Sequence, residues 1–321
     1  MNQTKKITQG AMMLAIMGAL IIIDRMFGFF FDTFIVMIVP LVIIMYSCMN
    51  TVKDGMILSV GILILTFLLA NFQFIYLIYV PVGIFNGLCY SYAVSKNKDT
   101  RTLMLVSIIT YTLGEVIATF VVYPLLGFPI STMVESFMEE FKSMSNISGV
   151  NYLEVFTSSG FDLVKLIGII YVVSTIITGI FEGFLIHILS VTFLKRFKIK
   201  DLGRINIYEV KGNKPLAYIC LFMTSMLFFT KNITNETVYY LVTVLSILSA
   251  FVLFYYGYIF VILYGSMVLR KNIGFFVVLL SVFIPSLLML LIIAGFLYAS
   301  GPLRIYLERK VAEVQNLQNK Q

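Results

Sequence analysis

The sequence is poor in the residues from which most metal and nucleotide sites are built. It has no tryptophan, three cysteines and one histidine, and only 12% of its residues are charged. With His187 as the only histidine and no CxxC pair, a multi-histidine zinc site is excluded. The GxxxxGK[ST] phosphate-binding loop is also absent, so any ATP-driven work must come from a partner. We therefore expect neither a resident metal nor a cofactor.

Long hydrophobic runs fill most of the chain. Hydrophobic residues make up 60% of the sequence, and the mean hydropathy is +0.98. An apolar run of about 18 or more residues spans the bilayer core of roughly 30 Å as a helix. Because the runs lack the alternation of polar and apolar residues that marks barrel strands, helices are favoured. The sequence predicts an all-α protein, a polytopic transmembrane helical bundle.

We predict eight or nine membrane spans. The apolar runs are separated by short polar loops, with one longer amphipathic stretch at residues 130–162. The predicted spans are Ile7–Ile23, Thr33–Met49, Met56–Ala70, Phe74–Ser95, Leu103–Leu126, Phe161–Leu194, Pro215–Phe229, Thr237–Leu269 and Ile273–Ala299.

The short loops predict the orientation of the chain in the cell membrane. Lys and Arg gather in alternate loops, for example at Lys53, Lys96 and Lys195, which places the amino terminus in the cytoplasm. Nine spans would put the basic tail outside, against this rule, so either one run does not cross or the tail is an exception. The net charge of +7 then reflects topology and contact with anionic lipid. We expect no binding to nucleic acid.

Small residues form a strip in the first span. Ala11, Ala15 and Ala19 recur every four residues and so lie on one face of a helix. Such a strip lets another helix approach closely. The approaching helix belongs either to this chain or to a partner protein, and the strip alone leaves both alternatives open.

The fourth and sixth spans contain nearly identical pentapeptides, GIFNG at residues 83–87 and GIFEG at residues 179–183. Each holds a GxxxG pattern, which permits close contact between helix backbones. With about 1.5 Å of rise per residue, Asn86 and Glu182 lie about 15 and 20 Å from the predicted inner boundary. We therefore predict similar, near-central depths for both side chains.

Two polar stripes predict a binding site around these residues. One stripe follows one face of the fifth span and consists of Tyr111, Glu115, Thr119 and Tyr123. The other follows one face of the sixth span and consists of Tyr171, Thr175, Thr178 and Glu182. An ionisable side chain at this depth costs several kcal/mol unless it is paired or neutralised, so it marks a pathway or a site. The alternative is that the two acids are protonated and hold helices together. The candidate substrate-binding residues are Asn86, Tyr111, Glu115, Thr119, Thr178 and Glu182.

The first 200 residues resemble the S-components of energy-coupling factor (ECF) transporters. The resemblance rests on the alanine strip, the Lys53-Asp54-Gly55 start of the third span, the basic loop after the fourth, and the Lys195-Arg196-Phe197-Lys198 end of the sixth. In that family the strip docks the subunit onto a transmembrane coupling protein, which is joined to a pair of ATPases. The resemblance thus implies that Ala11, Ala15 and Ala19 are docking residues. It also implies a vitamin or metal-ion substrate beneath the outer loops.

The whole chain is similar to the YybS-like family of bacterial membrane proteins. This similarity includes Tyr255-Tyr256-Gly257-Tyr258 in the eighth span and Gly301-Pro302-Leu303-Arg304 after the ninth. Taken with the S-component resemblance, we expect an S-component-like membrane domain over residues 1–200, about three additional transmembrane helices over 201–300, and a polar tail over 301–321.

Two functional hypotheses follow. The first is a subunit that binds or transports a small solute, with membrane lipid, a small-molecule or cationic ligand, and an ECF-type coupling protein with its ATPases as partners. The second is a scaffold or regulatory protein of the cell envelope with no transport activity. We expect no enzymatic activity, because the sequence has no Ser/His/Asp, HExxH or paired-aspartate motif.

Overall fold

The computed structural model describes residues 3–71, 73–127, 132, 135–140, 142–143, 163–203, 212–233, 235–269, 277 and 285–318. Within these ranges the chain forms helices and turns and no strand, which confirms the all-α prediction. It divides into two compact units, Met1–Ile205 and Asn206–Gln321. Each unit is described by itself below.

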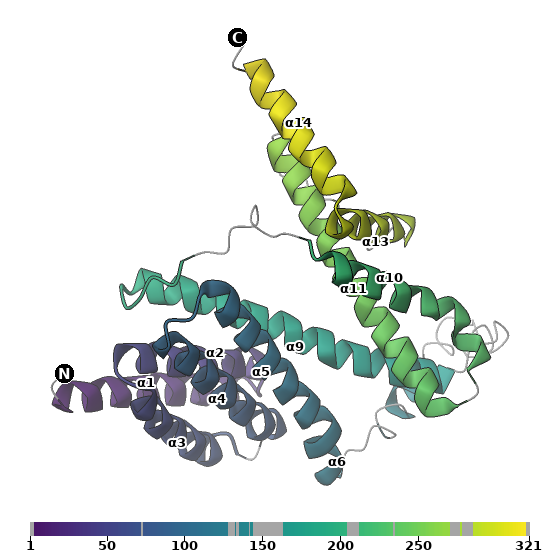
Figure 1. Ribbon diagram of the computed structural model, residues 1–321. Coiled ribbons are helices and arrows are strands. Elements are labelled where there is room, and N and C mark those ends of the chain that lie inside the picture. Colours follow the sequence, from purple (N-terminus) through teal and green to yellow (C-terminus); the bar gives the residue numbers. More distant parts are fainter. Residues whose placement is uncertain are drawn as a thin grey trace. The chain divides into compact units, whose positions relative to one another are not determined.

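The first unit is a bundle of long helices (Figure 1). Helix α2 contacts α1, α3, α4 and α9, and α5 contacts α4 and α9. The helices are α1 (Gln3–Met26), α2 (Asp32–Met49), α3 (Val52–Leu69), α4 (Phe74–Ser95), α5 (Thr100–Ile117), the π-helix η1 (Ala118–Val122), α6 (Tyr123–Leu125) and α9 (Leu163–Arg196).

Close packing between α2 and α4 forms the centre of this unit. A methyl group added at Gly83 would lie 3.0 Å from Pro40 Cδ, and one at Gly87 would lie 3.0 Å from the Pro40 carbonyl oxygen. The first GxxxG therefore lets the backbones of α2 and α4 approach, as the sequence predicts. Ile43 and Ile44 of α2 are completely buried as a result.

Hydrogen bonds join the predicted inner ends of α4, α5 and α9. Lys200 Nζ donates to the Val94 carbonyl oxygen and to Asn97 Oδ1, both at 3.0 Å. At the start of α5, Asp99 accepts a hydrogen bond from the Thr102 hydroxyl, which lowers the pKa of its carboxyl group. A side chain of this type before the first turn caps the helix. These hydrogen bonds hold the basic loops that we predict to lie in the cytoplasm.

The second unit is built around one long helix. It comprises α10 (Lys214–Ser225), the 3₁₀-helix η3 (Met226–Asn232), α11 (Glu236–Met267), α13 (Pro285–Ser300) and α14 (Pro302–Gln318). Gly257 of α11 and Gly295 of α13 face each other, and a methyl group at Gly295 would collide with the Leu253 carbonyl. Glycine is therefore required for the contact between these two helices.

Within the part of the chain that the structure describes, seven helices are long and apolar enough to cross a membrane: α1, α2, α3, α4, the continuous helix over residues 100–125, α9 and α11. An eighth candidate is α13 with the start of α14, which are bent by 82° relative to each other. The chain is therefore a multi-pass membrane protein.

Two of the nine predicted spans are matched only in part. The apolar helix at Lys214–Thr230, where we predicted the span Pro215–Phe229, is shorter than the seven candidates above. At about 1.5 Å per residue it reaches about 25 Å, at the lower limit for crossing a core of roughly 30 Å. Of the predicted span Ile273–Ala299, only residue 277 and the part from Pro285 onwards are described, and that part bends into α14 after Ser300.

The predicted orientation can be tested with two conservative cysteine variants. We expect Ser136→Cys, at an exposed site between α6 and α9, to react with a membrane-impermeant thiol reagent in intact cells. Ser95→Cys, at the exposed end of α4, should react only after permeabilisation. Unmodified protein, whose Cys48, Cys89 and Cys220 lie inside helices, is the control. The reverse labelling pattern would invert the assigned orientation.

Candidate functional site

A polar cavity of about 270 Å³ lies within the first unit. Five helical segments contribute to it: α2, α4, α5, α6 and α9. Its lining contains two carboxyl groups, three tyrosines and two threonines, together with two aliphatic side chains. The lining residues are Thr33, Val36, Ile75, Tyr79, Tyr111, Glu115, Tyr123, Thr178 and Glu182.

The acids and tyrosines of this cavity lie close to one another. Glu115 and Glu182 are near enough to interact electrostatically, with Tyr79 beside Glu115 and Tyr111 beside Glu182. No Lys, Arg or His is among the residues that line the cavity. Ionising both carboxyl groups inside a membrane without a compensating cation is costly, so we expect the pair to hold at least one proton.

The cavity has a buried floor and an exposed rim. Tyr111 and Glu115 form the floor and are only 1% and 4% exposed, whereas Thr33 and Thr178 are exposed at the rim. Thr33 belongs to the first turn of α2, and Thr178 lies one helical turn before Glu182 in α9. Under the predicted orientation, the rim faces the outside of the cell.

A π-helical turn shapes one wall of the cavity. In an α-helix each residue advances by about 100°, so Tyr123, eight residues after Glu115, would lie about 80° away around the axis. The segment η1 between them has the wider i→i+5 turn, which advances less per residue. This turn brings Tyr123 back to the side of Glu115, where both line the cavity.

Four of the six predicted substrate-binding residues line the cavity, namely Tyr111, Glu115, Thr178 and Glu182. Thr119, which lies within η1, does not line it. The sequence pattern assumed uniform α-helical spacing, and the π turn breaks that spacing.

Asn86 lies apart from the cavity, between α4 and α5. Its Nδ2 donates to the Ser107 carbonyl oxygen at 2.8 Å and to Thr110 Oγ1 at 2.9 Å. Ser107 Oγ in turn donates to the Gly183 carbonyl oxygen at 2.8 Å. Asn86 therefore joins α4 to α5, and through Ser107 to α9. The expectation that Asn86 converges with Glu115 and Glu182 is not met by this arrangement.

The second GxxxG pattern brings α9 against α5. A methyl group at Gly179 would lie 2.6 Å from Thr112 Cα, and one at Gly183 would lie 2.7 Å from Ile108 Cα. These are backbone atoms that cannot move aside without shifting the helix. Because Glu182 lies between the two glycines in sequence, this close contact sets its carboxyl group beside Glu115.

The cavity also includes residues outside the predicted set of substrate-binding residues. Tyr79 and Tyr123 supply two of its hydroxyl groups, and Thr33 lies at its rim. Tyr123 belongs to the predicted polar stripe of the fifth span. Tyr79 precedes Asn86 by seven residues, or two helical turns, so both side chains lie on one face of α4. Tyr79 could therefore have been predicted from the position of Asn86 on that face. Thr33, Val36 and Ile75 carry no such signal, because α2 and α4 come together only through tertiary packing.

The single histidine takes part in a separate contact. His187 is buried, and its Nδ1 lies 3.0 Å from the Tyr90 hydroxyl oxygen. A single buried histidine with a local hydrogen-bond partner is interpreted as a packing residue and not as part of a ligand site. Among the described residues, no group of three or more His, Cys, Asp or Glu side chains could hold a metal ion.

The alanine strip of α1 is exposed. Ala11, Ala15 and Ala19 all lie on the exposed face, whereas Met13 and Met17 on the other face are buried in the bundle. Within the described part of the chain, the helices of the first unit pack on that other face. Of the two alternatives for the strip, contact with a helix outside this unit fits the exposure.

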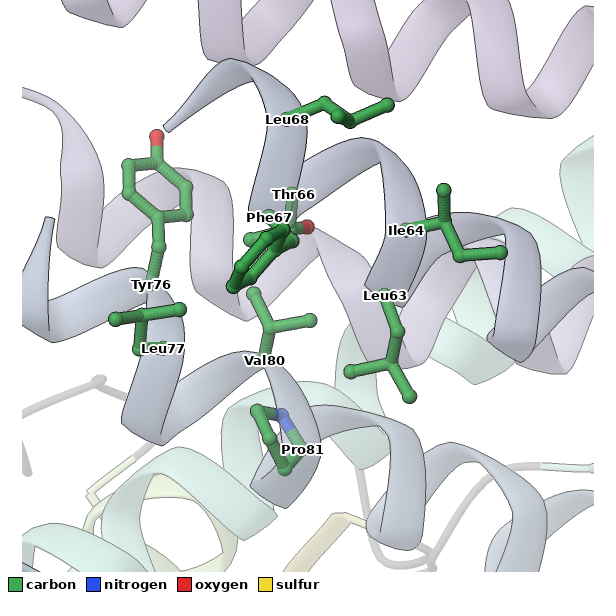
Figure 2. Close-up of a pocket in the computed structure, with 9 residues that line it drawn as sticks. All are labelled: Leu63, Ile64, Thr66, Phe67, Leu68, Tyr76, Leu77, Val80 and Pro81. Atoms are coloured by element: carbon green, nitrogen blue, oxygen red, sulfur yellow. The ribbon is translucent and has the colours of Figure 1, made fainter. Parts of the chain in front are cut away.

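A second, apolar pocket of about 350 Å³ lies between α3 and α4 (Figure 2). Its lining residues Leu63, Ile64, Phe67 and Leu68 are 41% to 68% exposed. The Tyr76 hydroxyl donates to Asp24 Oδ2 at 2.7 Å and is thereby satisfied. An exposed apolar surface on a membrane-spanning helix is the surface that contacts lipid. We assign this pocket to the lipid-facing side.

Comparisons with known proteins place the chain in one family. The model of the family described as "Predicted membrane protein (DUF2232)" matches residues 15–297. No curated protein and no solved structure matches the chain.

Proposed function

We propose that this chain, which belongs to the DUF2232 family of predicted membrane proteins, is a non-enzymatic subunit that binds a small solute within the membrane. The observation that carries the proposal is the cavity in which Glu115 and Glu182 face Tyr79, Tyr111 and Tyr123. Ligand sites combine a concave space with a few convergent polar groups, and ionisable residues inside a bilayer mark such sites.

The depth of the carboxyl pair fits a site loaded from outside. Glu115 lies 14 residues after Arg101, and Glu182 lies 13 residues before Lys195. At about 1.5 Å per residue these separations correspond to about 21 and 20 Å from the inner boundary, within a core of roughly 30 Å. We propose that the amino terminus is cytoplasmic and that the solute enters the cavity from the outer face of the cell membrane.

We propose further that the first unit works as an S-component does, docked onto a transmembrane coupling protein with ATPases. The exposed face of α1 supports this, because Ala11, Ala15 and Ala19 offer a smooth surface to a partner helix. The resemblance over residues 5–200 supplies the kind of partner. Under this proposal, the second unit is a part that a plain S-component does not have.

The direct test is mass spectrometry of the full chain purified in mild detergent, recording retained small molecules and associated subunits together. We expect a retained solute that is lost from the Glu115→Gln/Glu182→Gln double variant. If the protein carries no solute and co-purifies with envelope proteins that have no ATPase, the scaffold hypothesis replaces this one.

Ala15→Leu tests the docking surface separately. Because Ala15 is exposed on α1, we expect leucine to insert and fold normally but to prevent close approach of a partner helix. The measurement is the amount of co-purified coupling protein at equal membrane yield and equal melting temperature. The matched control is Ile16→Leu, an exposed neighbour whose bulk hardly changes. A fall in melting temperature without partner loss would mean that the strip packs within the chain.

A further inference from the structure

We propose that the cavity takes a small organic monocation, an alkylammonium or quaternary ammonium ion, in exchange for one proton of the carboxyl pair. This inference rests on the proposed solute-binding function and names the chemical class of the solute. It is carried by the composition of the lining, the volume of the cavity and the position of Glu115 and Glu182 together in that lining.

The lining selects for positive charge. Of the described residues that form the cavity, two are acids and none is Lys, Arg or His. An anionic solute would meet two carboxyl groups with no compensating cation, which is costly at low dielectric. A cation would find both a carboxylate and aromatic rings, whose faces attract ammonium groups. The aromatic residues are Tyr79, Tyr111 and Tyr123.

The geometry favours an organic monocation over a metal ion. Mg²⁺ and Ca²⁺ take six or more oxygen ligands, and in Mg²⁺ sites several of these are water. Here two carboxyl groups line the cavity, and among the described residues no third His, Cys, Asp or Glu side chain joins them in a group that could hold a metal ion. The cavity of about 270 Å³ also far exceeds the volume of about 30 Å³ that one water occupies in the liquid. It leaves room for a solute of several heavy atoms.

The balance of charge in the cavity determines that a proton leaves when a monocation binds. Among the described residues that line the cavity, no Lys, Arg or His neutralises an ionised carboxylate, so one carboxyl group of the pair is expected to carry a proton. When a monocation enters, the O–H bond of the protonated carboxyl breaks, its electron pair stays on oxygen, and the proton passes to water at the rim. One positive charge enters and one leaves. The other titratable groups facing the pair are tyrosine hydroxyls from α4, α5 and α6, while α2 contributes only Thr33 and Val36.

Choline and its uncharged carbon isostere, dimethylbutanol, have nearly the same shape, but only choline carries a charge. Comparing their affinities therefore measures what the charge contributes to binding. We expect the purified full chain to bind choline at least about tenfold more tightly than dimethylbutanol, the factor that a desolvated cation–π and carboxylate contact supplies. Calorimetry in phosphate and in MOPS buffer, which differ in ionisation enthalpy, should report release of about one proton per choline bound. Lower pH should weaken choline binding and leave dimethylbutanol unaffected.

Two variants test whether the preference for choline depends on Glu115 and Glu182. Glu115→Gln/Glu182→Gln keeps hydrogen-bonding amides but holds no exchangeable proton, so its preference for choline should disappear while its melting temperature stays close to that of the parent. Glu135→Gln, at an exposed acid outside the cavity, should retain the preference. Equal affinity for both probes, or no affinity for choline, would overturn the monocation inference. Retention of a neutral or anionic solute in the mass spectrometry would still support the proposed function.

Discussion

Glu182→Gln and Glu182→Leu are expected to give different results, and the difference separates binding from folding. Glutamine keeps the size and a hydrogen-bonding group beside Glu115 and Tyr111, so it should fold normally and lose solute binding. Leucine leaves these polar neighbours without a hydrogen-bonding group inside the membrane, where a hydrogen bond between helices is worth roughly 1 to 2 kcal/mol. We expect the leucine variant to lose about 2 kcal/mol of stability as well as binding, measured by thermal unfolding and by retained solute.

The control for this pair is Asn86→Leu, which removes a hydrogen-bonding residue outside the cavity. Asn86 bonds Ser107 and Thr110 between α4 and α5, so leucine there should lower stability while the remaining folded protein still binds solute. If both Glu182 variants bind solute as the parent does and differ only in melting temperature, the acids serve to hold helices together. The scaffold hypothesis would then lead.

Gly183→Ala is expected to separate α9 from α5 and to disturb the cavity from a distance. The added methyl group would meet Ile108 Cα and the Ser107 carbonyl oxygen, both at 2.7 Å, and backbone atoms cannot rotate away. Overpacking of this kind costs typically about 1 to 3 kcal/mol. We expect a clear fall in melting temperature together with weaker solute binding, because Glu182 would move with the α9 backbone.

Gly18→Ala is the matched control for this substitution. It lies in the interior of α1, and the nearest atom to an added methyl group is the tip of the Leu65 side chain at 3.2 Å. A flexible side chain can give way, so the variant should melt within a few degrees of the parent and bind solute normally. Equal destabilisation by both alanines would mean that the α5–α9 contact is no tighter than an ordinary helix contact.

Part of the site could be predicted because it depends on local periodicity. Tyr111 and Glu115 are four residues apart, as are Thr178 and Glu182, and both pairs line the cavity. Helical spacing alone puts each pair on one face, and the cost of exposing an acid to lipid turns that face inward.

Other parts could not be predicted, because they depend on a local departure from the α-helix or on which helices meet. Tyr123 lines the cavity and Thr119 does not, because of the π turn between Glu115 and Tyr123, which no spacing rule reveals. The pentapeptides look like a pair, yet Asn86 bonds a neighbouring helix while Glu182 lines the cavity. Their surroundings differ because α4 packs on α2 through its glycines and α9 packs on α5.

The sequence by itself determined the solvent and therefore the fold class. Hydrocarbon leaves backbone polar groups no partner outside the chain, so long apolar runs must form helices, and the GxxxG patterns predicted close contacts that the structure contains. Only the tertiary structure decided which polar side chains share one space. The carboxyl groups of Glu115 and Glu182 come from helices far apart in the sequence, and they meet because Gly179 and Gly183 let two backbones approach within contact distance.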